Sequence, residues 1–257
     1  VIDILGIKNI KKHSQIKYLN NAIKTYKSPK HEVTIAMCGK YNSLHDAYKS
    51  ILEAFIHAST LNSARINLKW IDTEDLENQK NQNEQFKNIH GILIPGGFGN
   101  RGIEGKVISS QYARENKIPF FGICLGMQCA VIDYARNVCG LDNANSTEFD
   151  SKTSYPVIDI MPNQKEVTHK GATMRLGSYS CDIKKDTKIY KSYQETQINE
   201  RHRHRYEFNN KYLEEIEKNG MVMGGVNKDL NLVETIELKD HPWFIGVQYH
   251  PELKSRV

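Results

Sequence analysis

The chain has 257 residues, 39% of them hydrophobic and 25% charged, which are the proportions of a globular protein with a substantial core. Its net charge of +5, from 35 basic and 30 acidic residues scattered along the chain, argues against a nucleic-acid-binding protein. No apolar run approaches the roughly 20 residues of a membrane span, and the five cysteines form no Cys-x-x-Cys pair, so we expect a reducing, cytoplasmic setting without a membrane or metal site.

The first half of the chain alternates predicted strands with predicted helices. Residues 1–31 are rich in Lys and Asn and are predicted to be a linker or tail, which leaves one domain at 32–257. Because the chain begins with Val1, we expect a fragment or a processed chain. Hydrophobic periodicity predicts strands at 32–38, 64–71, 91–95 and 119–123, and helices at 44–61, within 72–88, at 103–116 and at 127–134. This alternation is typical of an α/β fold with a doubly wound, mostly parallel sheet and flanking helices.

After Cys139 the pattern changes to short strands. They are predicted at 155–161, 172–183, 201–208, 221–227, 231–238 and 244–249, with one helix near 210–219. We expect these strands to form an antiparallel extension of the same sheet.

Cys124 is the most distinctive residue of the chain. It follows a predicted buried strand, precedes a predicted helix and is flanked by Gly122 and Gly126, the layout of a nucleophile elbow. The positive end of the helix dipole favours a thiolate over a thiol. A buried cysteine is usually inert packing, but the other four lack such flanking glycines, so Cys124 is the candidate nucleophile.

Two further segments supply what a nucleophilic cysteine needs. His250 follows an apolar strand and Glu252 stands two residues later, so they could act as base and orienting carboxylate, or simply form a surface turn. The glycine-rich run 96–99 could be a bare turn, a phosphate-binding loop or an oxyanion hole. The last interpretation suits a cysteine enzyme, with the backbone N–H groups of Gly97 and Leu125 as donors.

These motifs carry a resemblance to a known family. Residues 94–99 (IPGGFG), 122–128 (GICLGMQ) and 250–252 (HPE), in this order, resemble the triad-type class I glutamine amidotransferases. Further blocks are similar to the glutaminase domains of CTP synthases: 39–41 (GKY), 46–50 (DAYKS), 101–105 (RGIEG), 143–148 (NANSTE), 173–177 (TMRLG), 200–207 (ERHRHRYE) and 241–244 (HPWF). The resemblance covers roughly 32–255, and a variable loop is expected at 163–171.

The resemblance implies roles for individual residues. Cys124 would be the nucleophile, His250 the general base and acid, and Glu252 its orienter. The implied oxyanion hole and glutamine-binding site comprise Gly97, Leu125, Gly126, Met127, Gln128, Glu148 and Arg205. A carboxylate suits the ammonium of a free amino acid and an arginine fork suits its α-carboxylate.

The run 201–205 (RHRHR) has two other interpretations, a nucleic-acid-binding patch and a His-x-His metal site. Both interpretations are less favoured because the run lies in a predicted strand, where alternate side chains face opposite ways.

The resemblance also implies partners outside this chain. L-glutamine would be hydrolysed to glutamate and ammonia without a cofactor in this domain, and a synthase domain of the same polypeptide, with ATP and Mg, would use the ammonia to convert UTP to CTP. GTP would be the allosteric activator, sensed by a loop that contains Phe98 and Arg101. Two alternatives remain: another cysteine hydrolase on this sheet, such as a γ-glutamyl peptidase, and a non-catalytic binding module that keeps a relic site.

Overall fold

The structure is a computed structural model that describes residues 14–40, 45–78, 82–160 and 174–256. Its strands are β1 (His31–Gly39), β2 (Ala64–Asp72), β3 (Gly91–Ile94), β4 (Phe120–Ile123), β5 (Asn145–Ser146), β6 (Pro156–Ile160), β7 (Arg175–Ile183), β8 (Gln197–His204), β9 (Tyr206–Phe208), β10 (Met221–Asn227), β11 (Leu232–Leu238) and β12 (Phe244–Val247). Its α-helices are α1 (Ser14–Lys27), α2 (Lys49–Asn62), α3 (Thr73–Asn78), α4 (Gln82–Gln85), α5 (Ile103–Glu115), α6 (Leu125–Asn137), α7 (Lys188–Tyr193) and α8 (Leu213–Lys218). Short 3-10 turns lie at His45–Tyr48, Asn210–Tyr212 and Pro251–Lys254.

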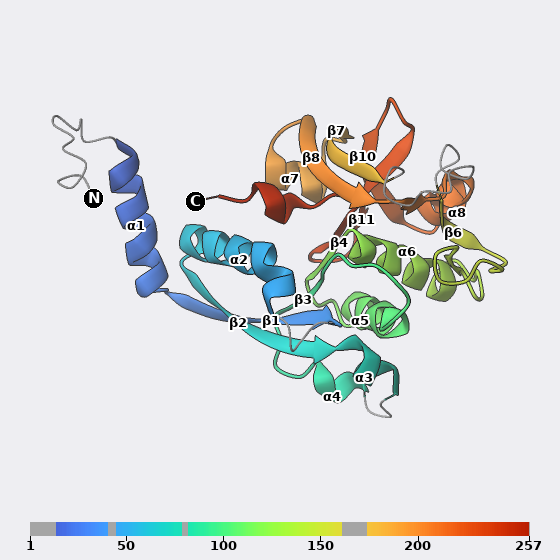
Figure 1. Ribbon diagram of the computed structural model, residues 1–257, viewed down its shortest axis with the longest axis horizontal. Coiled ribbons are helices and arrows are strands. Elements are labelled where there is room, and N and C mark those ends of the chain that lie inside the picture. The colour runs from blue at the N-terminus through green and yellow to red at the C-terminus, as the bar shows by residue number, and fades with distance from the viewer. Residues whose placement is uncertain (1–13, 41–44, 79–81, 161–173, 257) are drawn as a thin grey trace.

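Among these residues the strands form one sheet of nine and one of three (Figure 1). The large sheet has the order β2-β1-β3-β4-β12-β11-β10-β7-β8, and the small one has the order β5-β6-β9. The pairs from β2 through β12 are parallel, and those from β12 through β8 are antiparallel. The predicted α/β fold with an antiparallel extension is therefore confirmed.

The pairing of β4 with β12 brings distant parts of the chain together. The two strands run parallel, with Ile123 opposite Val247. Cys124 comes directly after β4 and His250 comes three residues after β12. Because the carboxyl ends of neighbouring parallel strands meet at one edge of a sheet, both side chains reach the same place.

The hydrophobic core lies on both faces of the large sheet. In β1, Ala36 and Cys38 pack into one cluster with residues of α5 and α6, whereas Met37 packs into a second cluster with Ile51 of α2. Helices therefore cover both faces, as Figure 1 shows, and the predicted doubly wound arrangement follows from the alternation of side chains along each strand.

Two parts of the sequence prediction differ from the structure. Within the predicted linker 1–31, Ser14–Lys27 form helix α1, which lies against α2 and exposes Leu19, Ile23 and Tyr26. The predicted strand 201–208 is divided at Arg205, because β8 belongs to the large sheet and β9 to the small one.

Smaller differences concern short elements and the limits of the described chain. Helix α7 and strand β5 were not predicted, since six and two residues are too short to show a period. The loop expected at 163–171 lies outside the described residues. No helix in the described ranges combines the length and the apolar character that crossing a bilayer requires.

Candidate active site

Cys124 sits on a strained turn between β4 and α6. Its backbone has φ 53° and ψ −104°, and its N–H donates to the Val247 carbonyl oxygen at 2.7 Å. A Cβ on Gly122 would lie 2.6 Å from the Gly126 carbonyl carbon, and a Cβ on Gly126 would overlap the carbonyl oxygen of Ile94. Both flanking positions therefore require glycine, which confirms the elbow geometry predicted from the sequence.

The other four cysteines are poor candidates for a nucleophile. Burial raises the pKa of the Cys38 and Cys129 thiols to about 12 and that of Cys139 to about 11. Burial also raises the pKa of Cys181. Because the thiolate is the reactive form, these four thiols would be largely inert at neutral pH.

His250 connects Cys124 to Glu252. Its Nδ1 lies 2.7 Å from Glu252 Oε1, and its ring lies close enough to the Cys124 side chain to interact with it. Burial lowers the pKa of His250, but the hydrogen bonds and charges of Cys124 and Glu252 outweigh burial and raise the pKa to about 10. The arrangement therefore favours a protonated imidazole between the side chains of Cys124 and Glu252. The backbone N–H of His250 donates to the Arg201 carbonyl oxygen at 2.8 Å, which fixes His250 to β8.

The glycine loop after β3 closes over the cysteine and the histidine. A Cβ on Gly96 would lie 2.7 Å from His250 Cε1 and 3.5 Å from Cys124 Cβ, so only glycine leaves room for the imidazole. A Cβ on Gly97 would lie 3.4 Å from Leu125 Cδ2. The two residues predicted as oxyanion-hole donors thus lie side by side next to Cys124.

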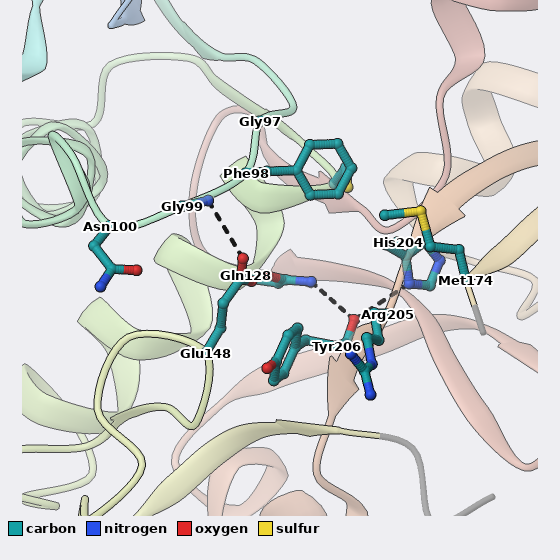
Figure 2. A pocket seen from close by; sticks show the side chains of 11 residues that line it. Gly97, Phe98, Gly99, Asn100, Gln128, Glu148, Met174, His204, Arg205 and Tyr206 are labelled. Carbon is teal, nitrogen blue, oxygen red and sulfur yellow. Dashed lines mark hydrogen bonds between the residues drawn. The ribbon is translucent and has the colours of Figure 1, made fainter. Parts of the chain in front are cut away.

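A cavity of about 370 Å³ opens beside Cys124 (Figure 2). It is lined by Gly97, Phe98, Gly99, Asn100, Cys124, Gln128, Glu148, Met174, His204, Arg205 and Tyr206. Glu148 Oε1 accepts a hydrogen bond from the Gly99 N–H at 3.3 Å. Four predicted glutamine-binding residues, Gly97, Gln128, Glu148 and Arg205, come from four separate segments and meet here.

The remaining predicted binding residues do not line this cavity. Met127 is fully buried in the hydrophobic core, Gly126 packs against β3, and Leu125 is 2% exposed. Any contact from these three residues with a ligand would come from their backbone. Arg101, predicted to sense GTP, forms an exposed ion pair with Glu74 at 3.0 Å and does not line the cavity either.

Phe98 lies where this cavity meets a second one. The second cavity, of about 290 Å³, is lined by Ala47, Tyr48, Ser50, Ile51, Gly96, Gly97, Phe98, Cys124, Arg203, His250 and Glu252. The Phe98 ring is 41% exposed and has the Arg203 guanidinium 5.7 Å from its centroid. Cys124 therefore borders both cavities, while His250 and Glu252 line only the second.

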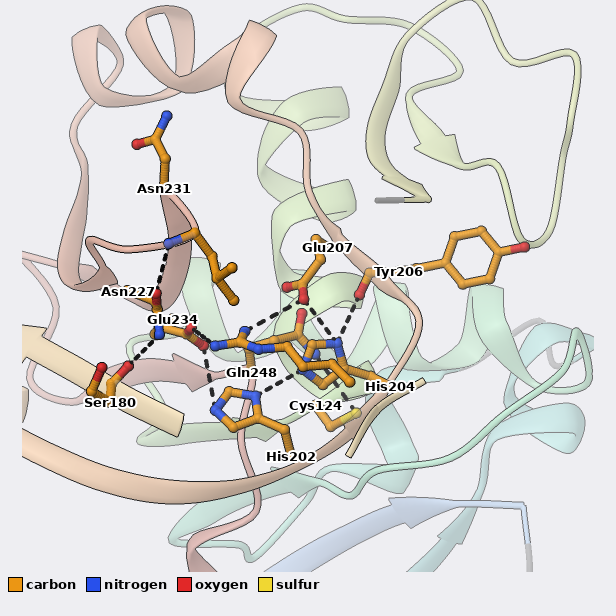
Figure 3. Close-up of polar contacts among 12 residues, drawn as sticks. Cys124, Ser180, His202, His204, Tyr206, Glu207, Asn227, Asn231, Glu234 and Gln248 are labelled. Atoms are coloured by element: carbon orange, nitrogen blue, oxygen red, sulfur yellow. Dashed lines mark hydrogen bonds and ion pairs between the residues drawn. The ribbon is translucent and has the colours of Figure 1, made fainter. Parts of the chain in front are cut away.

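A buried polar network adjoins the first cavity through His204 (Figure 3). Arg175 forms ion pairs with Glu234 at 2.6 Å and with Glu207 at 3.4 Å. His202 Nδ1 lies 2.8 Å from His204 Nε2, and burial lowers the pKa of these two imidazoles to about 2 and about 3. Both histidines are therefore neutral at physiological pH.

The run RHRHR divides its side chains between two environments. Arg201 and Arg203 face outward, whereas His202 and His204 face inward into the network. This is the alternation that the sequence predicted. His202 packs within the network, and His204 also lines the first cavity.

Sequence reasoning missed several residues of the site. His204 and Tyr206 line the cavity beside Arg205, and Met174 reaches it from the residue before β7. Their strands could be predicted, but which ends approach Cys124 depends on the order of strands in the sheet. Gln248, whose Nε2 lies 3.7 Å from Cys124 Sγ, was also missed, although it stands in the same short segment as His250.

Comparisons with known proteins agree with this geometry. Residues 43–257 match the glutamine amidotransferase class-I family. CTP synthases from Clostridium acetobutylicum and Clostridium kluyveri are 55% and 57% identical over 234 and 224 residues, which are 91% and 87% of this chain. These matches cover 44% and 42% of the relatives, so the chain spans less than half of their length.

Solved structures give the same result. A Trypanosoma brucei CTPS glutaminase domain with bound acivicin superposes with a TM-score of 0.80 at 39% identity, over 86% of each chain. A glutamine amidotransferase from Thermotoga maritima shares the fold at a TM-score of 0.51 and 12% identity, over 86% of this chain and 76% of its own. The chain therefore belongs to the class I glutamine amidotransferases and, within them, to the glutaminase domains of CTP synthases.

Proposed function

We propose that Cys124, His250 and Glu252 are the catalytic triad of this glutaminase domain. The observation that carries the proposal is the arrangement of Cys124, His250 and Glu252 along one cavity, with His250 bonded to Glu252 and the sulfur also at the wall of the cavity that contains Glu148 and Arg205. A cysteine on a sharp turn, a base within hydrogen-bond reach and a carboxylate that orients the base are the parts that covalent catalysis requires.

The reaction would proceed through a thioester. The Cys124 thiolate attacks the side-chain amide carbon of L-glutamine, and the backbone N–H groups of Gly97 and Leu125 stabilise the negative oxygen. The C–N bond then breaks, and His250 gives its proton to the nitrogen, which leaves as ammonia. A water molecule next gives a proton to His250 and attacks the thioester carbon. The C–S bond breaks with its electron pair returning to sulfur, and glutamate leaves.

Two charged residues would select a free α-ammonium and α-carboxylate. Glu148 would hold the α-ammonium and Arg205 the α-carboxylate, while Gln128 lines the cavity beside them. A γ-glutamyl peptide carries the same two charges on its γ-glutamyl residue, so these contacts would select the glutamyl group, and it is the family of the chain that favours free glutamine. We therefore propose L-glutamine as the substrate and treat γ-glutamyl peptides as the competing class.

The fate of the ammonia concerns the longer protein. Because the relatives named CTP synthase are more than twice as long as the matched region, we propose that a synthase domain of the same polypeptide uses the ammonia, with ATP and Mg, to convert UTP to CTP in the cytoplasm. This domain itself would need no cofactor. GTP remains the proposed activator, and Phe98 is a better candidate contact than Arg101, since it lies beside both cavities.

The test uses the cysteines themselves. Cys124→Ala should abolish the release of glutamate from glutamine, with GTP and the synthase domain supplied, and should leave the chain folded at the assay temperature. Cys139→Ala is the matched control and should keep full activity, because Cys139 lies outside both cavities. Mass spectrometry after treatment with acivicin should find the label on Cys124. Retained activity in Cys124→Ala, or a label on another cysteine, would contradict the proposal, and faster cleavage of γ-glutamyl peptides than of glutamine would favour the peptidase.

A further inference from the structure

Gln248 is a buried amide in direct contact with the proposed nucleophile. It follows β12, two residues before His250, and is fully buried. Its side-chain nitrogen lies 3.7 Å from Cys124 Sγ, within hydrogen-bond distance for sulfur, and Figure 3 shows the two side chains meeting. The roles proposed above for the triad and the oxyanion hole leave this contact without a function.

A second amide fixes the orientation of Gln248. The side-chain nitrogen of Gln128 donates to the Tyr206 carbonyl oxygen at 3.0 Å and to Gln248 Oε1 at 3.2 Å. Because Gln128 presents a donor, Gln248 must turn its oxygen toward Gln128 and its N–H₂ group toward the sulfur. The backbone N–H of Gln248 donates to the Glu234 carbonyl oxygen at 2.8 Å, which holds the residue in place.

We propose that Gln248 is a catalytic residue whose side-chain N–H donates a hydrogen bond to the Cys124 sulfur and stabilises its thiolate. The inference rests on the proposed function, in which Cys124 is the nucleophile. The thiolate appears twice in the reaction: before it attacks glutamine, and again when the thioester C–S bond breaks and the electron pair returns to sulfur. At both points Gln248 donates a hydrogen bond without giving up its proton, so no proton has to be returned to it later.

The length of the contact suits this role. A short, strong hydrogen bond would lower the basicity of the thiolate and with it the nucleophilicity. A long N–H···S contact stabilises the charge modestly and mainly fixes the direction of the sulfur. Gln128 also lines the cavity that contains the proposed substrate-binding residues. The side chains of Gln128 and Gln248 therefore connect that cavity to the proposed nucleophile.

The experiment measures the pH dependence of Cys124 alkylation by iodoacetamide in the 257-residue chain, with the modified cysteine identified by mass spectrometry. Gln248→Met removes the donor at similar volume, and Gln248→Glu keeps an acceptor for Gln128 while placing a carboxylate against the sulfur. The midpoint should rise by about one pH unit in Gln248→Met, and further in Gln248→Glu. In the glutaminase assay kcat should fall about tenfold and KM should change little, because the bond acts on the sulfur and not on the bound amino acid.

Asn227→Leu is the matched control. Asn227 is also a buried amide, on β10, and its side chain donates to the Ser180 carbonyl oxygen at 2.8 Å and accepts from the Leu230 N–H at 2.9 Å, remote from Cys124. It should lower the melting temperature without moving the alkylation midpoint. An unchanged midpoint in both folded Gln248 variants, or an equal shift in Asn227→Leu, would overturn the proposal.

The wild-type chain provides a measurement that does not depend on the folding of the variants. The side-chain N–H₂ signals of Gln248 in an NMR spectrum should move with the Cys124 titration and should lose that movement in Cys124→Ala. Signals that do not respond to the titration would refute the hydrogen bond. Failure of the proposed function would look different: the wild-type chain would release no glutamate even with GTP and the synthase domain supplied, while the alkylation midpoint would still depend on Gln248.

Discussion

Gly96 offers a direct test of how closely His250 must approach Cys124 if the two act as the proposed base and nucleophile. In Gly96→Ala the new Cβ would lie 2.7 Å from His250 Cε1, whereas carbon atoms in contact are at least about 3.5 Å apart. The imidazole would have to withdraw by about 0.8 Å, the difference between these two distances. Because a misplacement of this size can reduce a rate about 100-fold, we expect kcat/KM for glutamine to fall by about two orders of magnitude.

The fold should tolerate this change. Gly96 lines a cavity and does not have a backbone conformation that only glycine adopts. The assay is glutamate release together with thermal unfolding. Gly140→Ala is the control, because Gly140 has φ +69° and a methyl group there would meet no atom within 4 Å, so alanine should cost about 1 to 2 kcal/mol of stability and no activity. A folded Gly96→Ala chain with activity within a few-fold of wild type would refute the argument that His250 acts from its observed position.

Three further predictions concern charge and packing. The pKa of His250 should fall from about 10 toward its ordinary 6.5 in Cys124→Ala, which NMR titration of the ring can measure. In the wild type, the stabilisation that comes from the raised pKa should be complete below about pH 6.5 and lost as the pH rises through about 10. A free energy of unfolding that stays constant over this pH range would argue against the ion pair. Arg175→Met should destabilise the chain by about 3 to 5 kcal/mol near neutral pH, because it leaves the carboxylates of Glu207 and Glu234 buried without a cation. Acid should restore part of that loss, since burial already raises the pKa of both carboxyls, and denaturant unfolding that shows no such recovery would count against the network. Gly126→Ala should lower the melting temperature strongly, since its Cβ would overlap a β3 carbonyl, and a wild-type melting curve would contradict the packing of the elbow.

The sequence predicts the parts of this site that depend on local geometry. The elbow around Cys124 requires particular residues at particular positions, and the structure shows the steric reason in the contacts of Gly122 and Gly126. The same holds for the glycine loop at Gly96 and for the strand that ends just before His250. Each of these signals lies within a few residues of the chain.

Other parts depend on the order of the strands and could not be predicted. Gln248 contacts Cys124 only because β12 inserts between β4 and β11, and the cavity residue Tyr206 is placed by its position next to the break at Arg205. Helix α1 was missed for a different reason: Leu19, Ile23 and Tyr26 recur at helical spacing, but the Lys- and Asn-rich composition of the segment led to its interpretation as a linker.

The break at Arg205 has a consequence for how such a protein can change over time. The carbonyl oxygen of Arg201, at the other end of this run, accepts a hydrogen bond from the His250 backbone, whereas Arg205 stands where the chain leaves the large sheet for the small one. Insertions or shifts in the small sheet could therefore move the Arg205 guanidinium without displacing Cys124 or His250. The proposed catalytic residues and the choice of substrate could then change independently during evolution, and a new specificity could arise while the catalytic residues stay the same.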